Sequence, residues 1–319
     1  MKTRRLFYED VYIQEFEAIV LSCEEKYGKY HVILNATAFY PEGGGQPADK
    51  GMIDNIPVAD VQYIDGELCH IMESPLEEGA QVVGKIDWNW RFDLMQQHSG
   101  EHIVSGMIHE KYGYENVGFH MGEEIITIDL SGMLTWQQVQ EIEKKVNYYI
   151  WMNQQVNIFY PDERQRKFIP YRSKKELTGE IRLVEFPGAD LCACCGLHVT
   201  HASQIGLVKI LSCKKFRDGV RMEMLSGKRA LDYLSGSTEQ NSQIAVSLSV
   251  KENETKEAVQ RLLDEVYDLK GQLAREKQKS FEAKAASFAG KGNVLLIEDT
   301  MEAAEVRKCT DSIDRKSVV

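Results

Sequence analysis

The sequence predicts an α+β protein whose N-terminal part is all β, and three observations lead to this prediction. Residues 1–87 contain short segments rich in Val, Ile and Tyr, separated by turn residues, as is typical of strands. Residues 88–235 alternate between helical and strand-like patterns. From about residue 237 to residue 279, Ser, Gln, Glu and Lys dominate, and apolar residues at a 3-4 spacing predict a coiled coil.

The composition is that of a globular protein. Of the 319 residues, 43% are hydrophobic and 27% are charged, which distinguishes the chain from a disordered one. No apolar run approaches the length that spans a membrane, and the basic N-terminus has no apolar signal-peptide region behind it. Seven cysteines, three of them within four positions (Cys192, Cys194 and Cys195), predict reduced thiols and a metal site. We therefore expect a cytoplasmic protein.

Five segments of the first 87 residues are expected to be strands. They cover residues 11–24, 29–34, 56–64, 68–72 and 82–86. Turn residues such as Asp65-Gly66 separate them. Several short strands in succession predict a small barrel or a sandwich.

A glycine-rich loop lies between the second and third of these segments. Gly43, Gly44 and Gly45 allow unusual backbone dihedrals and leave a bare backbone surface. Prolines stiffen both flanks, and Gln46 supplies a polar side chain. A flexible hairpin is the alternative, but these features favour a loop that contacts a ligand.

Segment 87–109 has apolar residues at helical spacing, and Asp87 is a suitable N-cap. His98 and His102 are four residues apart, so they share one face of the expected helix. Imidazole is a good zinc ligand at neutral pH. Gly100 lies between them, and a glycine inside a helix costs about 1 kcal/mol relative to alanine. A close approach of another backbone could explain this glycine.

A second pair of metal-ligand residues, Cys194 and His198, is again separated by three residues. A thiolate together with imidazoles suits a borderline-soft ion such as zinc. Cys194 could instead be a buried thiol and His198 a solvated histidine. Two such pairs in one chain favour the metal.

The remaining elements before residue 235 alternate in type. The second half of segment 117–130 predicts a strand, and further strands are expected at 155–160, 181–186 and 206–211. Thr135 begins a capping-box pattern that predicts a helix. The apolar face of this helix consists of Val139, Ile142, Val146, Tyr149 and Ile150.

The net charge of −11 argues against a large non-specific nucleic-acid surface, but two local groups are basic. One lies between Arg164 and Arg182, and the other between Lys214 and Arg229. Each alone could be a solvated face, whereas together they could hold the phosphates of one RNA stem. The residues expected to bind RNA are Arg172, Lys174, Arg217 and Arg221.

The C-terminal apolar seam is about two heptads long. It could form an antiparallel hairpin with residues 244–250 or a homodimer contact. Beyond Gly290, a strand at 294–297 and a helix at 300–309 are too little to close a core. We expect residues 291–319 to be the start of an incomplete α/β domain. The seam consists of Val259, Leu262, Val266, Leu269 and Leu273.

The motifs His98-x-x-x-His102 and Cys194-x-x-x-His198, with Phe39-Tyr-Pro-Glu-Gly-Gly-Gly-Gln-Pro upstream, resemble the editing domain of alanyl-tRNA synthetase. The chain lacks a synthetase catalytic domain, so it is similar to the free-standing AlaX-type editing proteins in their longer form. The resemblance covers residues 1 to about 235. It implies a β-barrel at 1–87 and a zinc-dependent editing domain, related to one in threonyl-tRNA synthetase, at 88–235. A helical coiled coil at 236–290 and the segment 291–319 follow.

The resemblance implies hydrolysis of the ester that joins serine or glycine to tRNA(Ala). Thr37 matches a threonine that helps to recognise the seryl hydroxyl, and the glycine-rich loop with Gln46 would line the pocket and meet the RNA end. Phe119 and His120 are further candidates for substrate contact. Four protein ligands would close a tetrahedral site, so catalysis would need an open position or a loose ligand, for which His198 is the candidate. By position, the Zn2+ ligands would be His98, His102, Cys194 and His198.

This sequence departs from the family pattern at two places. Leu197 stands where the family usually has a threonine, and the extra thiols of Cys192 and Cys195 could compete with Cys194. The chemistry also stays open. Zinc could lower the pKa of a bound water to about 7, or it could hold the substrate while a water placed by a tRNA sugar hydroxyl attacks. Glu101 is a candidate base, with a purely supporting or solvated carboxylate as the alternative.

Two other functions are compatible with parts of the sequence. His98-Ser-Gly-Glu101-His102 satisfies the His-x-x-Glu-His pattern of inverzincin peptidases, but that hypothesis leaves Cys194 and the glycine-rich loop without a role. A non-catalytic tRNA-binding module, in which zinc only stabilises the fold, is favoured by Leu197 and a four-ligand site. Thr37 and the glycine-rich loop oppose it.

Overall fold

The computed structural model describes residues 2–173, 179–292, 295–297 and 301–317. It confirms the predicted α+β class and divides into two compact units, Met1–Ser235 and Gly236–Val319. Within the described ranges, none of the helices combines the length and the apolar character that crossing a membrane requires.

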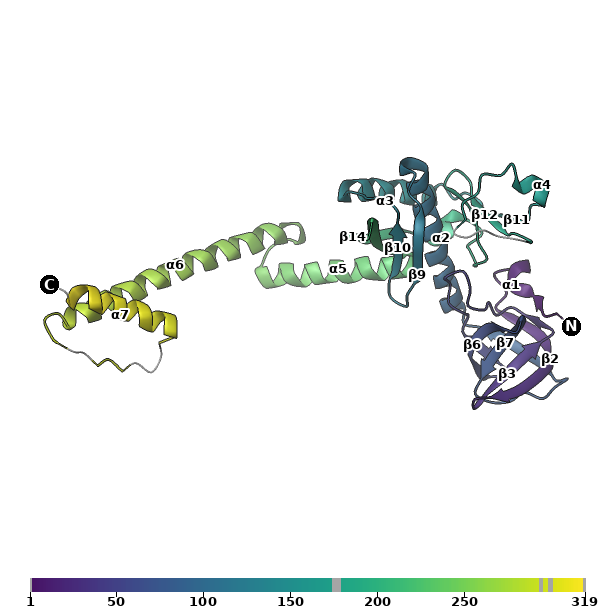
Figure 1. The fold of residues 1–319 in the computed structure, drawn as a ribbon, viewed down its shortest axis with the longest axis horizontal. Helices are drawn as coiled ribbons and strands as arrows, with labels where there is room; N and C mark the ends of the chain where they lie inside the picture. Colours follow the sequence, from purple (N-terminus) through teal and green to yellow (C-terminus); the bar gives the residue numbers. More distant parts are fainter. Residues whose placement is uncertain (1, 174–178, 293–294, 298–300, 318–319) are drawn as a thin grey trace. The chain divides into compact units, whose positions relative to one another are not determined.

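Six antiparallel strands at the start of the chain form a closed barrel (Figure 1). Four of the five segments predicted as strands match within one residue at each end, and the remaining one, β2, begins four residues later than expected. The three-residue β5 was not predicted, because so short a segment carries too little alternation to recognise. In barrel order the strands are β2 (Glu15–Lys26), β3 (Lys29–Leu34), β7 (Glu67–Met72), β6 (Ile56–Ile64), β5 (Gly51–Ile53) and β8 (Gln81–Ile86).

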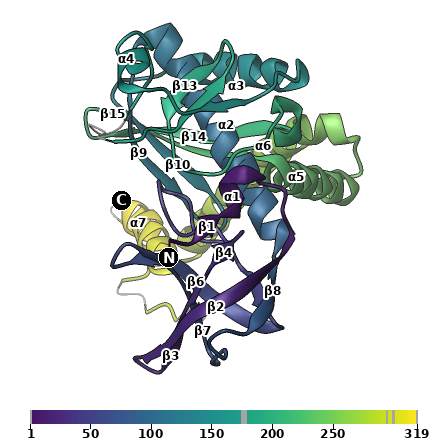
Figure 2. The same cartoon turned by 90° about the vertical axis from the view of Figure 1, so that its right-hand side faces the viewer.

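An N-terminal arm runs beside the barrel (Figure 2). Its strand β1 (Arg4–Arg5) pairs in parallel with β4 (Ala36–Thr37), and the short helix α1 (Leu6–Glu9) follows directly. Phe7 of this helix is buried in the core. The arm therefore holds Arg5 and Tyr8 in fixed positions next to the glycine-rich loop, which follows β4.

Helix α2 (Trp88–Tyr112) connects the barrel to the rest of the first unit. The predicted N-cap is confirmed, because the Asp87 carboxylate accepts a hydrogen bond of 3.2 Å from the backbone N–H of Trp90. The middle of the helix is buried on all sides, as expected for a central helix. At Gly100 a Cβ would lie 2.1 Å from Oγ of Ser226, so a neighbouring side chain explains this glycine, where we had expected a backbone.

An antiparallel four-stranded sheet and α3 (Trp136–Trp151) pack beside α2. The capping box predicted at Thr135 is confirmed, and the apolar face of α3 is buried except for the half-buried Tyr149. The strand predicted at residues 206–211 continues to residue 216, and its hairpin partner β15 was missed. The sheet order is β14 (Val208–Phe216), β15 (Gly219–Ser226), β10 (Ile126–Leu130) and β9 (Asn116–Met121).

A smaller sheet carries the cysteine-rich segment. Its order is β11 (Asn157–Phe159), β12 (Leu183–Phe186) and β13 (Asp190–Ala193). Cys192 therefore lies in strand β13, which was not among the strands predicted from the sequence. The short helix α4 (Glu163–Arg166) precedes β12, and a 3-10 turn at Ala202–Ile205 leads to β14.

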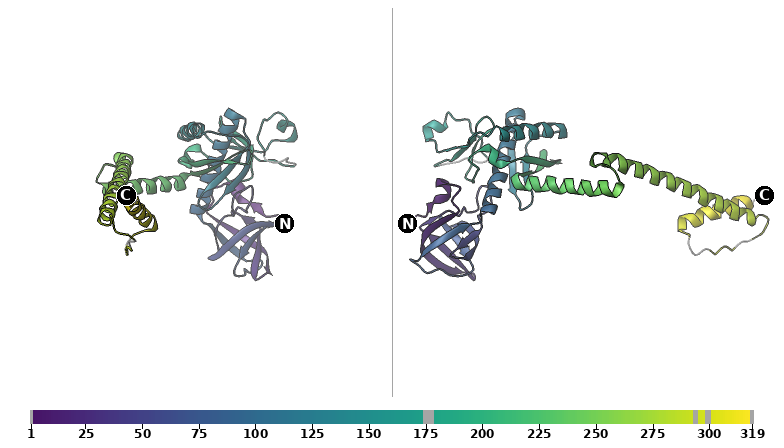
Figure 3. Two further views of the ribbon diagram at one scale, coloured as in Figure 1. Left: turned by 60° about the vertical axis from the view of Figure 1, so that its left-hand side comes forward. Right: turned by 180° about the vertical axis from the view of Figure 1, so that it is seen from behind.

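The second unit is helical. Helix α5 (Gly227–Leu248) leads into it, a 3-10 turn at Glu252–Glu254 follows, and α7 (Ala303–Ser317) packs against the C-terminal part of α6 (Thr255–Ser287; Figure 3). Phe281, Ala285 and Cys309 are buried in this contact, and Lys277 forms an ion pair with Glu305.

The C-terminal predictions are met in part. The five seam residues of α6 are 42% to 56% exposed, so an antiparallel hairpin with residues 244–250 does not bury them. The expected helix at 300–309 exists but begins at Ala303 and extends to Ser317, with Thr300 outside the described residues. A strand was also expected at 294–297. Val294 lies outside the described residues, and residues 295–297 form no strand.

Candidate metal centre

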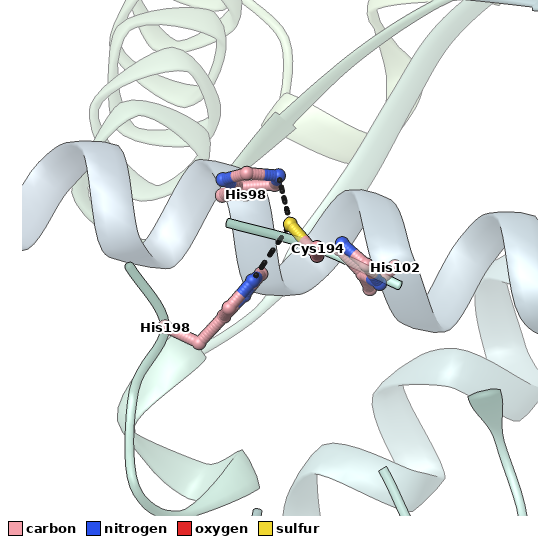
Figure 4. Close-up of side chains that lie close together, drawn as sticks. All are labelled: His98, His102, Cys194 and His198. Atoms are coloured by element: carbon pink, nitrogen blue, oxygen red, sulfur yellow. Dashed lines mark hydrogen bonds between the residues drawn. The ribbon is translucent and has the colours of Figure 1, made fainter. Parts of the chain in front are cut away.

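Helix α2 and the loop after β13 bring four potential metal ligands together (Figure 4). The ligand atoms of the four residues all lie within 4.8 Å of one another. Sγ of Cys194 is 3.5 Å from Nε2 of His98 and 3.4 Å from Nε2 of His198. Tetrahedral zinc, with bonds of about 2.0–2.3 Å, requires ligand separations of about 3.5 Å. The donor set of His98, His102, Cys194 and His198 therefore fits zinc.

Each of the three imidazoles is held by an oxygen at its Nδ1, which leaves Nε2 available to a metal. Such contacts fix the ring orientation and the tautomer of metal-binding histidines. The pairs are His98 with Gln46 Oε1 (3.0 Å), His102 with Asp190 Oδ2 (2.8 Å) and His198 with Ser99 Oγ (3.3 Å).

Gln46 connects the glycine-rich loop to this cluster. Its Oε1 also accepts the backbone N–H of Leu197 at 2.9 Å, so one amide oxygen orients both His98 and the segment that carries His198. Gly196 must be a glycine here, because a Cβ would lie 2.1 Å from the His98 ring. Gln46, which the resemblance placed in the pocket lining, is not part of the cavity wall and instead orients the candidate ligand His98.

Of the three neighbouring thiols, that of Cys194 has the environment of a metal ligand. Burial raises its pKa, but the surrounding imidazoles outweigh burial and hold the pKa well below its usual value. Burial raises the pKa of Cys192 to about 11, and Cys195 is exposed. Cys192 does belong to a second, smaller group with His102 and Asp190 that could hold a metal. The geometry favours Cys194 as the thiolate of the four-residue set.

A cavity of about 630 Å³ opens onto the cluster, and His98, His102 and Cys194 lie in its wall. The glycine-rich loop closes one side of it with a tight turn in which Gly44 and Gly45 have positive φ, and the backbones of Gly43 and Gln46 are paired. These backbone hydrogen bonds define the turn and favour a shaped loop over the flexible-hairpin alternative.

Side chains cannot replace these turn glycines. A Cβ on Gly45 would lie 2.8 Å from the ring of Phe119, which stacks on His98, and a Cβ on Gly44 would lie 2.8 Å from Sγ of Cys195. The bare backbone is what allows the loop to approach the four candidate metal ligands so closely.

Glu101 also lies in the cavity wall although it is almost fully buried. Its Oε1 accepts hydrogen bonds from Ser105 Oγ at 2.6 Å and from Asn116 Nδ2. These bonds fix the carboxylate next to His98 and His102. Adjacent helix positions point about 100° apart, so Glu101 lines the same cavity as His98 and His102 but is not one of the four candidate ligands.

Thr37 is buried and is not part of the cavity wall. Burial lowers the pKa of His70 to about 4, so its ring is neutral near pH 7. The Nδ1–H of His70 donates to the carbonyl of Val32, and its Nε2 then accepts the Thr37 hydroxyl at 2.8 Å. The same hydroxyl oxygen accepts the backbone N–H of Phe39. In this structure Thr37 fixes the start of the glycine-rich loop.

The predicted RNA-binding residues fall into different places. His120 is exposed and points away from the cavity, because neighbouring residues of β9 face opposite sides. Arg217 is exposed at the β14–β15 turn, whereas Arg221 is paired with Asp129 at 2.6 Å. Lys174 lies outside the described residues. Arg172, predicted for the RNA surface, lies in the cavity wall instead.

Arg172 and His102 are joined through Asp190. Nε of Arg172 donates to Oδ1 at 2.7 Å, while Oδ2 accepts Nδ1–H of His102. The Asp190 carboxylate is buried. Burial alone would raise its pKa, but the contacts with His102 and Arg172 outweigh this effect and hold the pKa below its usual value. Sequence reasoning missed Asp190 as a site residue, although it opens the cysteine-rich motif.

We expect Asp190→Asn to weaken zinc binding by about 10- to 100-fold, because loss of the carboxylate frees the His102 ring to rotate or change tautomer. Competition with a chromophoric chelator measures this affinity. Asp232→Asn, which alters an exposed ion pair with Lys228, is the matched control and should leave it unchanged. Equal zinc affinity in the two variants would show that Asp190 does not support zinc binding.

Two family models match parts of the chain. The model for class II (A) tRNA synthetases matches residues 6–90, and the model for the second additional domain of threonyl and alanyl tRNA synthetases matches residues 181–222. The second match contains Cys194 and His198, whereas the two other metal-ligand candidates lie between the matched segments.

Relatives are similar over most of this chain. The alanyl-tRNA editing protein Aarsd1-B of Xenopus laevis is 34% identical over 79% of this chain and 66% of its own length. Aarsd1 of Mus musculus is 32% identical over 81% of this chain and 67% of its own length. The alanyl-tRNA editing protein AlaX-L of Pyrococcus horikoshii is 32% identical over 72% of this chain and 60% of its own length. The chain thus spans about two thirds of the length of these curated relatives.

Proposed function

The chain belongs to the alanyl-tRNA editing protein family, and on this premise we propose that it is a trans-editing hydrolase for tRNA(Ala) mischarged with serine or glycine. One observation carries the proposal: three members of a donor set that fits zinc line a single cavity together with the glycine-rich loop and Glu101. The reaction would release the free amino acid and uncharged tRNA.

The residues of the cavity can support ester hydrolysis. A zinc ion held by the four donors would supply Lewis-acid chemistry. Glu101 can accept the proton that the attacking water loses, and that proton can then go to the sugar oxygen as the ester bond breaks. Gln46 and Asp190 keep His98 and His102 in place during this cycle.

Deacylation by the purified, zinc-loaded protein tests the proposal. We expect it to release serine from Ser-tRNA(Ala) and to spare Ala-tRNA(Ala), with casein left intact in a parallel reaction. Bound zinc and bound tRNA without ester cleavage would instead support the non-catalytic module, which the closed set of four donors favours. Casein cleavage would support the peptidase hypothesis.

The β14–β15 hairpin is the part of the predicted basic surface that supports tRNA binding best. Lys214, Lys215 and Arg217 are exposed near its turn, and Phe216 packs under the guanidinium of Arg221, which is 3.9 Å from the ring centroid. Exposed cations bind phosphates and release counterions, so affinity that depends on them falls with salt.

We expect Lys214→Glu combined with Arg217→Glu to weaken tRNA binding and to reduce the slope of log affinity against log salt by about one per lost phosphate contact. Filter binding at several salt concentrations measures both quantities. Lys256→Glu combined with Arg261→Glu, on α6, is the control for total charge. If the two double variants behave alike, the hairpin does not contact the tRNA.

We also propose that the exposed seam of α6 forms a homodimer contact. The seam residues keep the spacing of a coiled coil and are 42% to 56% exposed within one chain. Sedimentation equilibrium distinguishes a dimer from a monomer.

A further inference from the structure

The cavity has a second wall that the metal centre does not use. Arg5, Tyr8, Tyr160 and Arg182 line the same space as His98 and Cys194. Arg5 and Tyr8 belong to the N-terminal arm, Tyr160 directly follows β11, and Arg182 directly precedes β12. No ligand role was predicted from the sequence for Arg5, Tyr8 or Tyr160. At about 630 Å³ the cavity is large enough for a ligand of drug size, and therefore for more than one amino acid.

Tyr8 is the fixed centre of this wall. Its hydroxyl donates to the carbonyl of Cys195 at 2.8 Å. The guanidinium carbons of Arg5 and Arg182 lie 5.3 Å and 5.1 Å from the centre of its ring. One aromatic ring thus holds two cations at the edge of the cavity.

Arg182 has an unused donor. It is only 8% exposed, and its Nη1 donates to the carbonyls of Cys194 at 2.8 Å and Gly196 at 2.9 Å. Among the residues that the structure describes, none provides an acceptor for its buried Nε–H. A buried charged donor without an acceptor is costly, so its position on a cavity wall points to an acceptor on a ligand.

The charge of this wall is also available to a ligand. Arg172, on the other side of the cavity, is paired with the Asp190 carboxylate. Among the described residues, neither Arg5 nor Arg182 forms an ion pair with a carboxylate; Glu180, which also lines the cavity, is exposed. In a chain with a net charge of −11, two such guanidinium groups at one cavity favour an anionic group.

Tyr160 completes the wall. Its side chain is 47% exposed at the cavity, so a face of the ring is open to a planar group. Single-stranded RNA is commonly bound by stacking its bases on aromatic rings and on arginine planes, while cations contact its phosphates.

We propose that Arg5, Tyr8, Tyr160 and Arg182 form a subsite for the terminal nucleotide of the RNA, with the base on Tyr160, the phosphate at Arg5 and Arg182, and Tyr8 holding the two arginines in place. This inference rests on the proposed function, because a nucleotide bound here carries its 3′ ester toward the metal centre. It adds a nucleotide-binding site that is separate from the four metal ligands.

Binding of adenosine 5′-monophosphate and of adenosine to the full chain, measured by titration calorimetry, tests the subsite without any catalytic turnover. We expect Tyr160→Ala to weaken both probes by about tenfold, which corresponds to one lost stacking contact. We expect Arg5→Ala to weaken the monophosphate by about tenfold and to leave adenosine unchanged, because only the monophosphate carries the anion.

Two matched variants control for charge and aromatic content. Arg4→Ala removes the neighbouring arginine, which pairs with Glu9, and Tyr148→Ala removes an exposed tyrosine of α3. Both should bind the two probes as the unaltered chain does. Arg5 and Tyr160 are chosen because neither holds the Cys194 loop, as Tyr8 and Arg182 do.

The outcomes separate this inference from the proposed function. Wild-type affinity in Tyr160→Ala and Arg5→Ala, or equal losses in the controls, would overturn the subsite even if the protein deacylates Ser-tRNA(Ala). Nucleotide binding with the expected pattern but without deacylation would uphold the subsite and overturn the proposed hydrolase.

Discussion

Cys194→Ala should remove bound zinc and lower Ser-tRNA(Ala) deacylation by about 1000-fold. Cys194 supplies the one thiolate of the cluster, and its Sγ lies within 3.5 Å of Nε2 of both His98 and His198. Without it, three imidazoles remain with no anionic ligand to offset the charge of the metal. Loss of a metal that stabilises the transition state by several kcal/mol corresponds to a rate loss of this size.

Metal analysis and single-turnover deacylation measure the two effects. The unaltered chain should contain about one zinc per chain, and Cys192→Ala and Cys195→Ala, which remove the neighbouring thiols, should keep it. If Cys194→Ala retains zinc while Cys192→Ala loses it, the metal belongs instead to the smaller group of His102, Asp190 and Cys192. Retained zinc with lost deacylation would mean that the thiol acts on the substrate.

Local signals explain why much of the fold could be predicted from the sequence. The N-cap of α2 at Asp87 and the capping box at Thr135 depend on contacts within four residues, and both are present. The strands β3 and β6 have the predicted bounds because turn residues flank them closely. The i, i+4 spacing of His98 and His102 places them on one side of α2 for the same local reason.

What escaped prediction depends on contacts between distant segments. In β15, Val220, Met222 and Met224 are buried in strict alternation, but the charged residues between them suggested only a basic surface. Alternation was the signal that could have identified this strand. Arg172 faces the cavity because Asp190 binds it, and nothing in the local sequence indicates that partnership.

The roles inferred from the resemblance show a similar limit. The motif places Thr37 at the start of the glycine-rich loop, but only the fold reveals that His70 from β7 binds its hydroxyl. Likewise Phe119 and His120 are equivalent candidates by sequence position. The pleat of β9 turns only Phe119 toward His98.

Asp49→Ala should lower the free energy of unfolding by about 3–5 kcal/mol, the second large effect that we expect. Asp49 follows the glycine-rich loop and pairs with Arg91 of α2, and both side chains are fully buried. Nε of Arg91 donates to Oδ1 of the carboxylate at 2.7 Å, and Nη2 donates to Oδ2. Nη1 and Nη2 also donate to the carbonyls of Val11 and Ala38. Removing the carboxylate therefore leaves a buried guanidinium without its counter-charge.

Urea denaturation compares this variant with Glu141→Gln, which alters the exposed Lys111–Glu141 pair and should change stability by no more than about 1 kcal/mol. The double variant Asp49→Ala with Arg91→Met tests the physical cause. If the uncompensated charge is responsible, removing it should restore part of the stability lost in Asp49→Ala. If the double variant is less stable than Asp49→Ala, the hydrogen bonds of Arg91 to the backbone matter more than its charge. In that case this arginine joins the barrel to helix α2 chiefly through those carbonyls.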